Sequence, residues 1–284
     1  SNGKFAVAAG VPIILNVFLI ISIFYAYFFD HSYVKSMAIA VFLSGLAQLI
    51  VLIIYSRNFF IPKINFIIKF GDQLKVFFKK LLPSIFSSGV MQINILVGTI
   101  IASFQSSAVS YLYYADRIYQ LPLAISGIAI GTVVLPVLSR SIASDTNERV
   151  LFLQNRSIEL SIFLSAPAAV GIIVGAEEII SCLFGYGSFN QESIYNTSRA
   201  LIIFGFGLPA FSLLKLYSNF YFARGDTSFP FKVSVFTVAM NILISLVFFE
   251  NFGFLSIAAG TSISCWLAVF VYKFSLKKKQ SSFI

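Results

Sequence analysis

Four polar side chains recur at helical spacing inside the long apolar stretch 111–138. Tyr113, Asp116, Arg117 and Gln120 stand at positions i, i+3, i+4 and i+7, so they share one face of a helix. Lipid tails cannot hydrate Asp116 and Arg117, and this face is expected to line a protein interior or a wet cavity. There Arg117 could hold an anionic group. The alternative is that both charges lie at headgroup level within a belt of tyrosines.

Beyond the polar cluster, the side chains on the same face become small. It continues through Ala124, Gly127 and Gly131, and a Gly-x-x-x-Gly spacing of this kind usually indicates close helix packing. Pro122 follows the polar cluster directly and could kink or break the helix. Broken helices at membrane depth are common where transporters bind their substrates.

Composition predicts the fold class. Hydrophobic residues make up 58% of the 284 residues, charged residues only 11%, and the mean hydropathy is +0.90. Apolar runs of about 20 residues, each able to cross ~30 Å of hydrocarbon as a helix, recur along the chain without strand-like alternation. We therefore predict an all-α polytopic membrane protein with about eight spans. They are 5–29, 34–56, 81–104, 111–138, 155–174, 199–222, 230–249 and 254–275.

Residue types that carry catalysis or bind metals are scarce. Cys182 and Cys265 fall in or beside different predicted spans, so their positions imply neither a disulfide framework nor a metal-type pair. The single histidine, His31, is expected in a short solvated loop. No paired carboxylates fall at membrane depth, and neither a phosphate-binding glycine loop nor a nucleophile with a base at helical spacing is present. We therefore expect no cofactor, no metal and no enzymatic activity.

Lysine and arginine predict the orientation. Most of the 20 basic residues fall in one set of alternate loops and ends, whereas the opposite loops are mainly acidic. Because cytoplasmic loops carry the excess of Lys and Arg, both ends are expected in the cytoplasm. The acidic loops hold Asp30, Glu177, Glu178, Glu192 and Glu250.

Two basic segments flank the main body of spans. Within 57–80, Leu74, Phe77 and Phe78 share a helical face opposite lysines, which predicts an amphipathic linker in the cytoplasmic headgroup layer. A nucleic-acid-binding arm is the disfavoured alternative. The segment 277–284 is expected to be a basic cytoplasmic tail.

Two other spans carry polar residues. One face of span 81–104 could line a cavity or supply hydrogen bonds between helices; it holds Ser84, Ser88, Gln92, Thr99 and Ser103. In span 199–222, Lys215 and Asn219 stand one turn apart, and Lys215 could either snorkel to the headgroups or face a cavity as a cation. Asn16, Gln48 and Asn241 are single polar residues expected to hydrogen-bond between helices.

Several motifs follow one another in a characteristic order. The most specific is Tyr113-Tyr-Ala-Asp-Arg117, continued by Tyr119-Gln-Leu-Pro122 and Gly131-Thr-Val-Val-Leu-Pro136. Two more are Phe184-Gly-Tyr-Gly-Ser-Phe189 and the hairpin around Tyr221 to Asp226. In order and spacing these motifs resemble the lipid II flippases of the MurJ/MviN family, and the resemblance covers essentially the whole chain.

The resemblance implies a fold of two six-helix lobes around a central cavity, within the superfamily of multidrug and polysaccharide exporters. Residues 1–56 would be the last two helices of the first lobe, and 81–276 the complete second lobe. The family's early helices and final pair have no counterpart, and the first residue is not Met, so we expect the chain to begin inside a longer protein. Many members have proline where this chain has Asn219.

The implied function is to flip lipid II, an anionic sugar-peptide on a polyprenyl tail, across the bacterial inner membrane by alternating access. Arg117 would contact the pyrophosphate, with Asp116 and Gln120 orienting it and Lys215 as a weaker candidate. The expected substrate-binding residues are Arg117, Asp116, Gln120, Tyr113, Gln92, Ser88, Lys215 and Asn219. Membrane lipids and the cell-wall synthesis machinery are further expected partners, and nucleic acid is not one.

Two alternatives remain open. The first is a flippase for another polyprenyl-linked oligosaccharide, which would share the fold and the cavity but differ in its headgroup contacts. The second is a non-transporting membrane scaffold or fragment.

Overall fold

The computed structural model contains helices and no strand in the residues it describes, 6–57, 92–143 and 147–281. The chain divides into two units, Ser1–Gly71 and Asp72–Ile284. The division falls within the predicted linker 57–80, of which residues 58–80 lie outside the described part.

The first unit is a helical hairpin. α1 (Ala6–Phe28) and α2 (Tyr33–Ser56) pack against each other. Ala26 and Ala40 are buried, and the hydroxyls of Ser22 and Ser44 each donate to a carbonyl of their own helix at 2.8 Å. Small side chains let membrane helices approach closely, because there is little side chain to separate the backbones.

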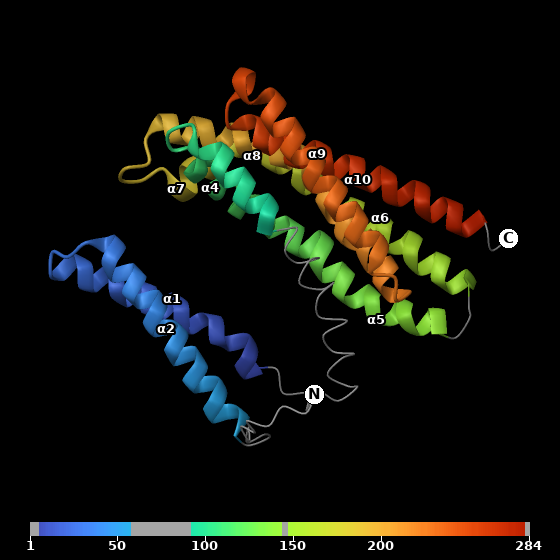
Figure 1. The fold of residues 1–284 in the computed structure, drawn as a ribbon, viewed down its shortest axis with the longest axis horizontal. Helices are drawn as coiled ribbons and strands as arrows, with labels where there is room; N and C mark the ends of the chain where they lie inside the picture. Colours follow the sequence, from blue (N-terminus) through green and yellow to red (C-terminus); the bar gives the residue numbers. More distant parts are fainter. Residues whose placement is uncertain (1–5, 58–91, 144–146, 282–284) are drawn as a thin grey trace, which may run out of the picture. The chain divides into compact units, whose positions relative to one another are not determined.

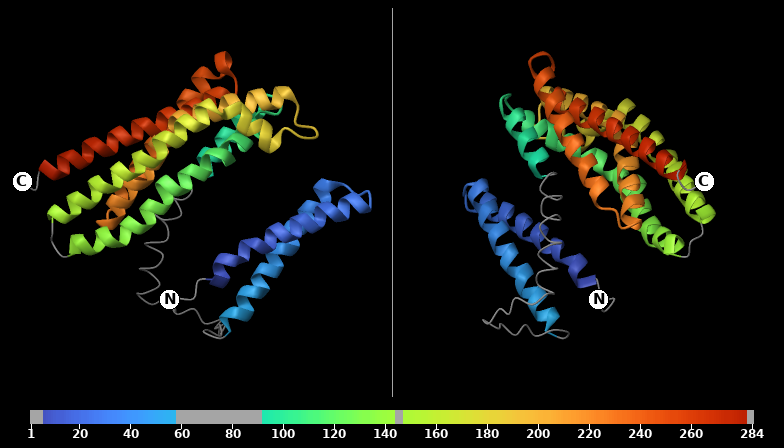
Figure 2. Two further views of the ribbon diagram at one scale, coloured as in Figure 1. Left: turned by 180° about the vertical axis from the view of Figure 1, so that it is seen from behind. Right: turned by 45° about the vertical axis from the view of Figure 1, so that its right-hand side comes forward.

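The second unit is a bundle arranged around one long helix (Figures 1 and 2). That helix, α8, packs against α4, α5, α6, α7 and α10, and its buried residues extend from Ile194 to Tyr221. The elements of the unit are the helix Gln92–Ser103, α4 (Ala108–Leu123), the π-helix η1 (Ala124–Ala129), α5 (Ile130–Ala143), α6 (Asn147–Val174), α7 (Ala176–Phe184), α8 (Gln191–Ala223), α9 (Ser228–Phe252) and α10 (Leu255–Ser281).

Small residues and hydroxyls join the helices of this bundle. A Cβ atom added to Gly260 of α10 would lie 2.9 Å from the carbonyl oxygen of Asn241 on α9. The Ser161 and Ser212 hydroxyls, on α6 and α8, share a hydrogen bond of 2.7 Å. Ser262 of α10 donates to the Ile203 carbonyl of α8 at 2.9 Å. Packing of small residues and bonds between helices substitute for the hydrophobic effect, which is weak between helices in lipid.

The predicted spans are confirmed where the structure describes them. Seven helices of the described residues are long and apolar enough to cross a membrane, and they coincide with seven of the predicted spans. The helix Gln92–Ser103 is the described part of the remaining span, 81–104.

Helix ends differ from the prediction in a consistent way. α6 begins at Asn147 rather than 155, and α8 begins at Gln191 rather than 199. Both helices continue past their apolar stretch into polar sequence, which hydropathy does not register. At α8 the Asn190 side chain accepts a hydrogen bond from the Ser193 N–H at 2.9 Å, a helix cap. The short helix α7 was not predicted.

Charge separates between the two ends of the second unit. Figure 1 shows the end of α5, the start of α6, the α8–α9 connection and the end of α10 at one end, and α7 with the α9–α10 connection at the other. The first end is basic, with Arg149, Arg224 and Lys232, whereas the second is acidic, with Glu178 and Glu250. We call these the basic end and the acidic end.

Candidate functional site

The polar cluster of α4 has two parts. Gln120 Nε2 donates a hydrogen bond to Asp116 Oδ2 one turn away, and a side-chain hydrogen bond also links Tyr119 to Asp116. The Tyr119 ring lies 4.9 Å from that of Phe204 and 5.1 Å from that of Phe211, both on α8. The carboxylate of Asp116 is therefore held by α4 side chains, one of which is anchored in the bundle.

Arg117 forms the second part. Its guanidinium carbon lies 4.6 Å from the centre of the Tyr113 ring, which is a cation–π contact. Both side chains are exposed in the second unit. The ring thus supports the cation from one side. The role predicted for Asp116 and Gln120 in orienting Arg117 stays a prediction, because their described bond is to each other.

After the polar cluster, the chain changes from an α-helix to a π-helix. Proline has no N–H to donate, so Pro122 interrupts the ladder of backbone hydrogen bonds. The chain becomes π-helical over Ala124–Ala129 and resumes as α5 at Ile130. The Ser126 hydroxyl donates to the Pro122 carbonyl at 2.9 Å. The helix is not broken at Pro122, because α4 continues to Leu123, and the π-helical turn that follows is of a kind frequent at functional sites.

The two glycines of this face give close packing, as predicted. A Cβ atom on Gly127 would lie 3.1 Å from the Cα atom of Ser212 on α8. A Cβ atom on Gly131 would collide with the side-chain amide of Asn219. Small residues therefore bring η1 and α5 against α8, directly below the polar cluster.

Lys215 and Asn219 of α8 have different surroundings. Lys215 is exposed in the second unit, whereas Asn219 is half-buried against Gly131 of α5. Asn219 therefore contributes to helix packing. Lys215 keeps both of its predicted roles, as a snorkelling residue or as a cavity cation.

The span 81–104 is described from Gln92 onward. Gln92 is exposed, and Ser88 lies outside the described residues. The hydroxyls of Thr99 and Ser103 donate to carbonyls of their own helix, at 2.8 Å and 2.7 Å.

A hydrogen-bonded pair connects this helix to α9. Asn241 Nδ2 donates to Asn94 Oδ1 at 2.8 Å, so the predicted interhelical role of Asn241 is confirmed. Ser245 donates to Asn241 Oδ1 at 3.3 Å, and Thr261 of α10 does so at 3.5 Å. Asn94 was not singled out from the sequence, although an amide within an apolar span was a usable signal.

Metal-ligating residues do not gather in the described ranges. Within 6–57, 92–143 and 147–281 no group of three or more His, Cys, Asp or Glu side chains is placed to hold a metal ion. Cys265 is buried on α10 and Cys182 is exposed on α7.

Comparisons with known proteins point to one family. The chain is 36% identical over 266 residues to the "Probable lipid II flippase MurJ" of Rhizobium tropici, covering 93% of this chain and 50% of the relative. It is 32% identical over 280 residues to that of Rickettsia prowazekii, covering 97% and 54%. The chain thus spans about half the length of these curated relatives.

Two solved transporter structures are similar to this chain in fold. "Lipid II flippase MurJ, inward closed conformation" superposes with a TM-score of 0.83 at 27% identity, over 97% of this chain and 57% of that one. An inward-facing multidrug resistance MATE family transporter of the MOP superfamily also reaches a TM-score of 0.83, over 99% of this chain and 65% of that one. At 16% identity the second likeness shows the fold alone.

The profile of the family described as "Lipid II flippase MurJ" matches residues 1–284. The match includes the signature Tyr113 to Arg117, which supplies three of the four residues of the cluster on α4. The resemblance predicted from these motifs is confirmed, and this multi-pass membrane chain belongs to the lipid II flippase MurJ family.

Proposed function

We propose that the protein carries out the flipping of lipid II, moving the lipid-linked peptidoglycan precursor across the bacterial inner membrane. The observation that carries the proposal is the exposed Arg117 on the Tyr113 ring, within a chain that the family profile matches from end to end. A cation inside a predicted span is costly in lipid and marks a functional site by default.

Arg117 suits the anionic part of such a substrate. A guanidinium presents paired N–H donors that fit two oxygens of one phosphate group. Among the described residues Asp116 accepts a hydrogen bond from Gln120, which leaves the guanidinium donors for the substrate. Tyr113 holds the guanidinium in place while leaving the donors available. We propose that Arg117 contacts the pyrophosphate and that Asp116, Gln120 and Tyr113 shape its surroundings.

The other expected site residues have secondary roles in this proposal. Lys215, exposed on α8, would be a second cation for the headgroup, and Gln92 and Ser88 would add polar contacts. Asn219 would act through packing against Gly131 of α5. The activity is transport by alternating access, in which the substrate keeps all its covalent bonds, and the partners are the lipid substrate, the surrounding lipids and the cell-wall synthesis machinery.

Complementation tests the proposal. The reading frame that carries this sequence is expressed in bacteria depleted of their own lipid II flippase, with Arg117→Ala and Arg117→Lys variants beside it. Arg156→Ala is the matched control, because Arg156 is an exposed arginine paired with Glu159 at 2.9 Å on the surface of α6.

We expect rescue by the natural sequence and by Arg156→Ala, and none by Arg117→Ala. Arg117→Lys should rescue weakly, since a lysine keeps the charge but not the paired donors. Rescue by Arg117→Ala at equal membrane abundance would show that Arg117 is not needed to bind the substrate. Failure of the natural sequence, with normal membrane insertion, would overturn the lipid II assignment and favour another polyprenyl-linked glycan or a scaffold.

A further inference from the structure

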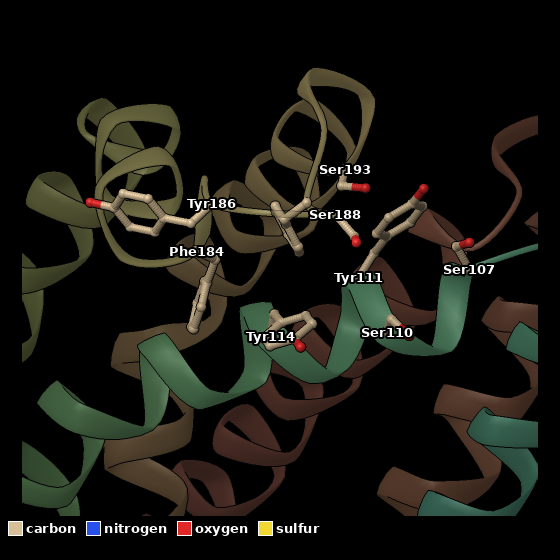
Figure 3. Close-up of a pocket in the computed structure, with 9 residues that line it drawn as sticks. Ser107, Ser110, Tyr111, Tyr114, Phe184, Tyr186, Ser188 and Ser193 are labelled. Carbon is tan, nitrogen blue, oxygen red and sulfur yellow. The ribbon is translucent and has the colours of Figure 1, made fainter. Parts of the chain in front are cut away.

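A cavity of about 380 Å³ opens at the acidic end of the second unit (Figure 3). One wall is the start of α4, with Ser110, Tyr111 and Tyr114. The opposite wall is the segment joining α7 to α8, which contains the motif Phe184 to Phe189. The function proposed above leaves this motif without a role.

The α7–α8 segment has a defined shape. Tyr186 N–H donates to the Phe184 carbonyl at 2.7 Å, and Phe189 N–H donates to the Tyr186 carbonyl at 3.2 Å. Gly187 between them has φ +62°, a conformation that glycine adopts without strain. The Tyr114 ring packs against Phe184 and Phe189, with ring centres 4.7 Å and 5.4 Å apart. The second wall is therefore fixed to the first through Tyr114.

Hydroxyl groups dominate the polar lining. In the described residues, the hydroxyls of Ser107, Ser110, Tyr111, Tyr114 and Ser188 make no hydrogen bond to another part of the chain. Figure 3 shows Ser110, Tyr111 and Tyr114 of α4 on one side of the cavity and Ser188 and Ser193 on the other. Each free hydroxyl can both donate and accept, so together they offer a ligand several neutral hydrogen-bonding partners.

Charge and shape narrow the ligand class. Among the described residues that line the cavity there is no Asp, Glu, Lys or Arg, so no side chain of opposite formal charge would pair with a charged ligand there. Aromatic rings alternate with hydroxyls, which suits a ligand with one apolar C–H face and a polar rim. A pyranose ring has this construction. The volume lies near the lower end of the ~300–1,000 Å³ typical of ligand pockets.

We propose that this cavity binds a neutral sugar ring. Its source would be the glycan of the transported lipid when the headgroup faces the acidic end, and that identification rests on the proposed function. Binding of the ring itself depends only on the cavity. Tyr186 is 71% exposed at the rim, where its ring could cover a bound sugar.

The test is saturation-transfer NMR on the protein in lipid nanodiscs, with N-acetylglucosamine and then its β-1,4-linked dimer as probes. Ser188→Trp fills the cavity, and Tyr114→Phe keeps the packed ring while removing one hydroxyl. Tyr195→Ala is the matched control, because Tyr195 is an exposed tyrosine of α8 that stands outside the cavity lining and faces Arg199.

We expect transfer to the sugar in the natural sequence and in Tyr195→Ala, and its loss in Ser188→Trp. Tyr114→Phe should weaken binding ~2–10-fold, the effect of one hydrogen bond. Absence of transfer in the natural sequence, or transfer unchanged in Ser188→Trp and Tyr114→Phe alike, would overturn the proposal. Growth rescue, measured for the same variants, separates the sugar site from the proposed flippase function. Sugar binding without rescue would support the sugar site and refute the flippase function. Rescue without sugar binding would support the flippase function and refute the sugar site.

Discussion

The Arg117 guanidinium lies 4.6 Å from the centre of the Tyr113 ring, one turn apart on the exposed side of α4. An aromatic ring attracts a cation to its face and limits the positions that the flexible arginine side chain adopts. The pair therefore presents a localised positive charge, and under the proposed function this lowers the entropic cost of binding an anionic headgroup.

Removal of the ring should weaken transport without abolishing it. A cation–π contact at an exposed site contributes ~0.5–1 kcal/mol, so Tyr113→Leu is expected to lower the transport rate ~2–5-fold. Tyr113→Phe keeps the ring and should behave as the natural sequence. Growth rescue over a range of expression levels measures the difference, and equal rescue by the leucine variant would show that the ring does not position Arg117.

Gly260 should be sensitive to a single methyl group. Its Cβ atom would meet the Asn241 carbonyl oxygen at 2.9 Å, so Gly260→Ala must push α10 away from α9, at a cost of ~1–3 kcal/mol. Gly171→Ala is the control, because a Cβ atom there meets nothing within 4 Å. It should keep or slightly raise stability, since alanine is the better helix former. Unfolding free energies in mixed micelles compare the two, and equal values would contradict the packing.

Asn94 and Asn241 should be energetically coupled. Their side chains share a hydrogen bond of 2.8 Å between the helix Gln92–Ser103 and α9. Bonds of this kind in membranes average ~0.6 kcal/mol in double-mutant cycles, so the double variant Asn94→Ala/Asn241→Ala should lose less stability than the sum of the single variants. Thr99→Val is the control partner, because the Thr99 hydroxyl bonds within its own helix, and its effect should add to that of Asn241→Ala. Additive losses of stability in both cycles would mean that the hydrogen bond between the two amides contributes nothing to the free energy of unfolding.

The spans could be predicted because a membrane imposes a length and an apolar composition on each helix. The stretch 230–249 lies inside α9 (Ser228–Phe252), and 254–275 lies inside α10 (Leu255–Ser281) except for its first residue. The close helix packing at Gly127 could also be predicted, because glycines spaced along one face of a membrane helix usually indicate such packing. Each of these features depends on local sequence alone.

Other features depend on partners distant in the chain. Asn241 bonds to Asn94, 147 residues away, and the identity of that partner follows from tertiary packing. α7 escaped prediction because Ala176–Phe184 is short and carries two glutamates, which an apolar-run criterion rejects. The pairing of Arg117 with Tyr113 was not predicted either, because one helical face offered Arg117 three polar neighbours at similar spacing.

The orientation of the chain is open to a direct measurement with cysteines. The positive-inside tendency predicts that the acidic end faces outward. In a background where Cys182→Ser and Cys265→Ala remove the native thiols, Glu192→Cys places an exposed thiol at the acidic end, and Arg149→Cys places one at the basic end. A membrane-impermeant maleimide added to intact spheroplasts should label only Glu192→Cys. Labelling of Arg149→Cys should require permeabilisation, and the inverse pattern would reverse the assigned orientation and place the sugar cavity on the cytoplasmic side.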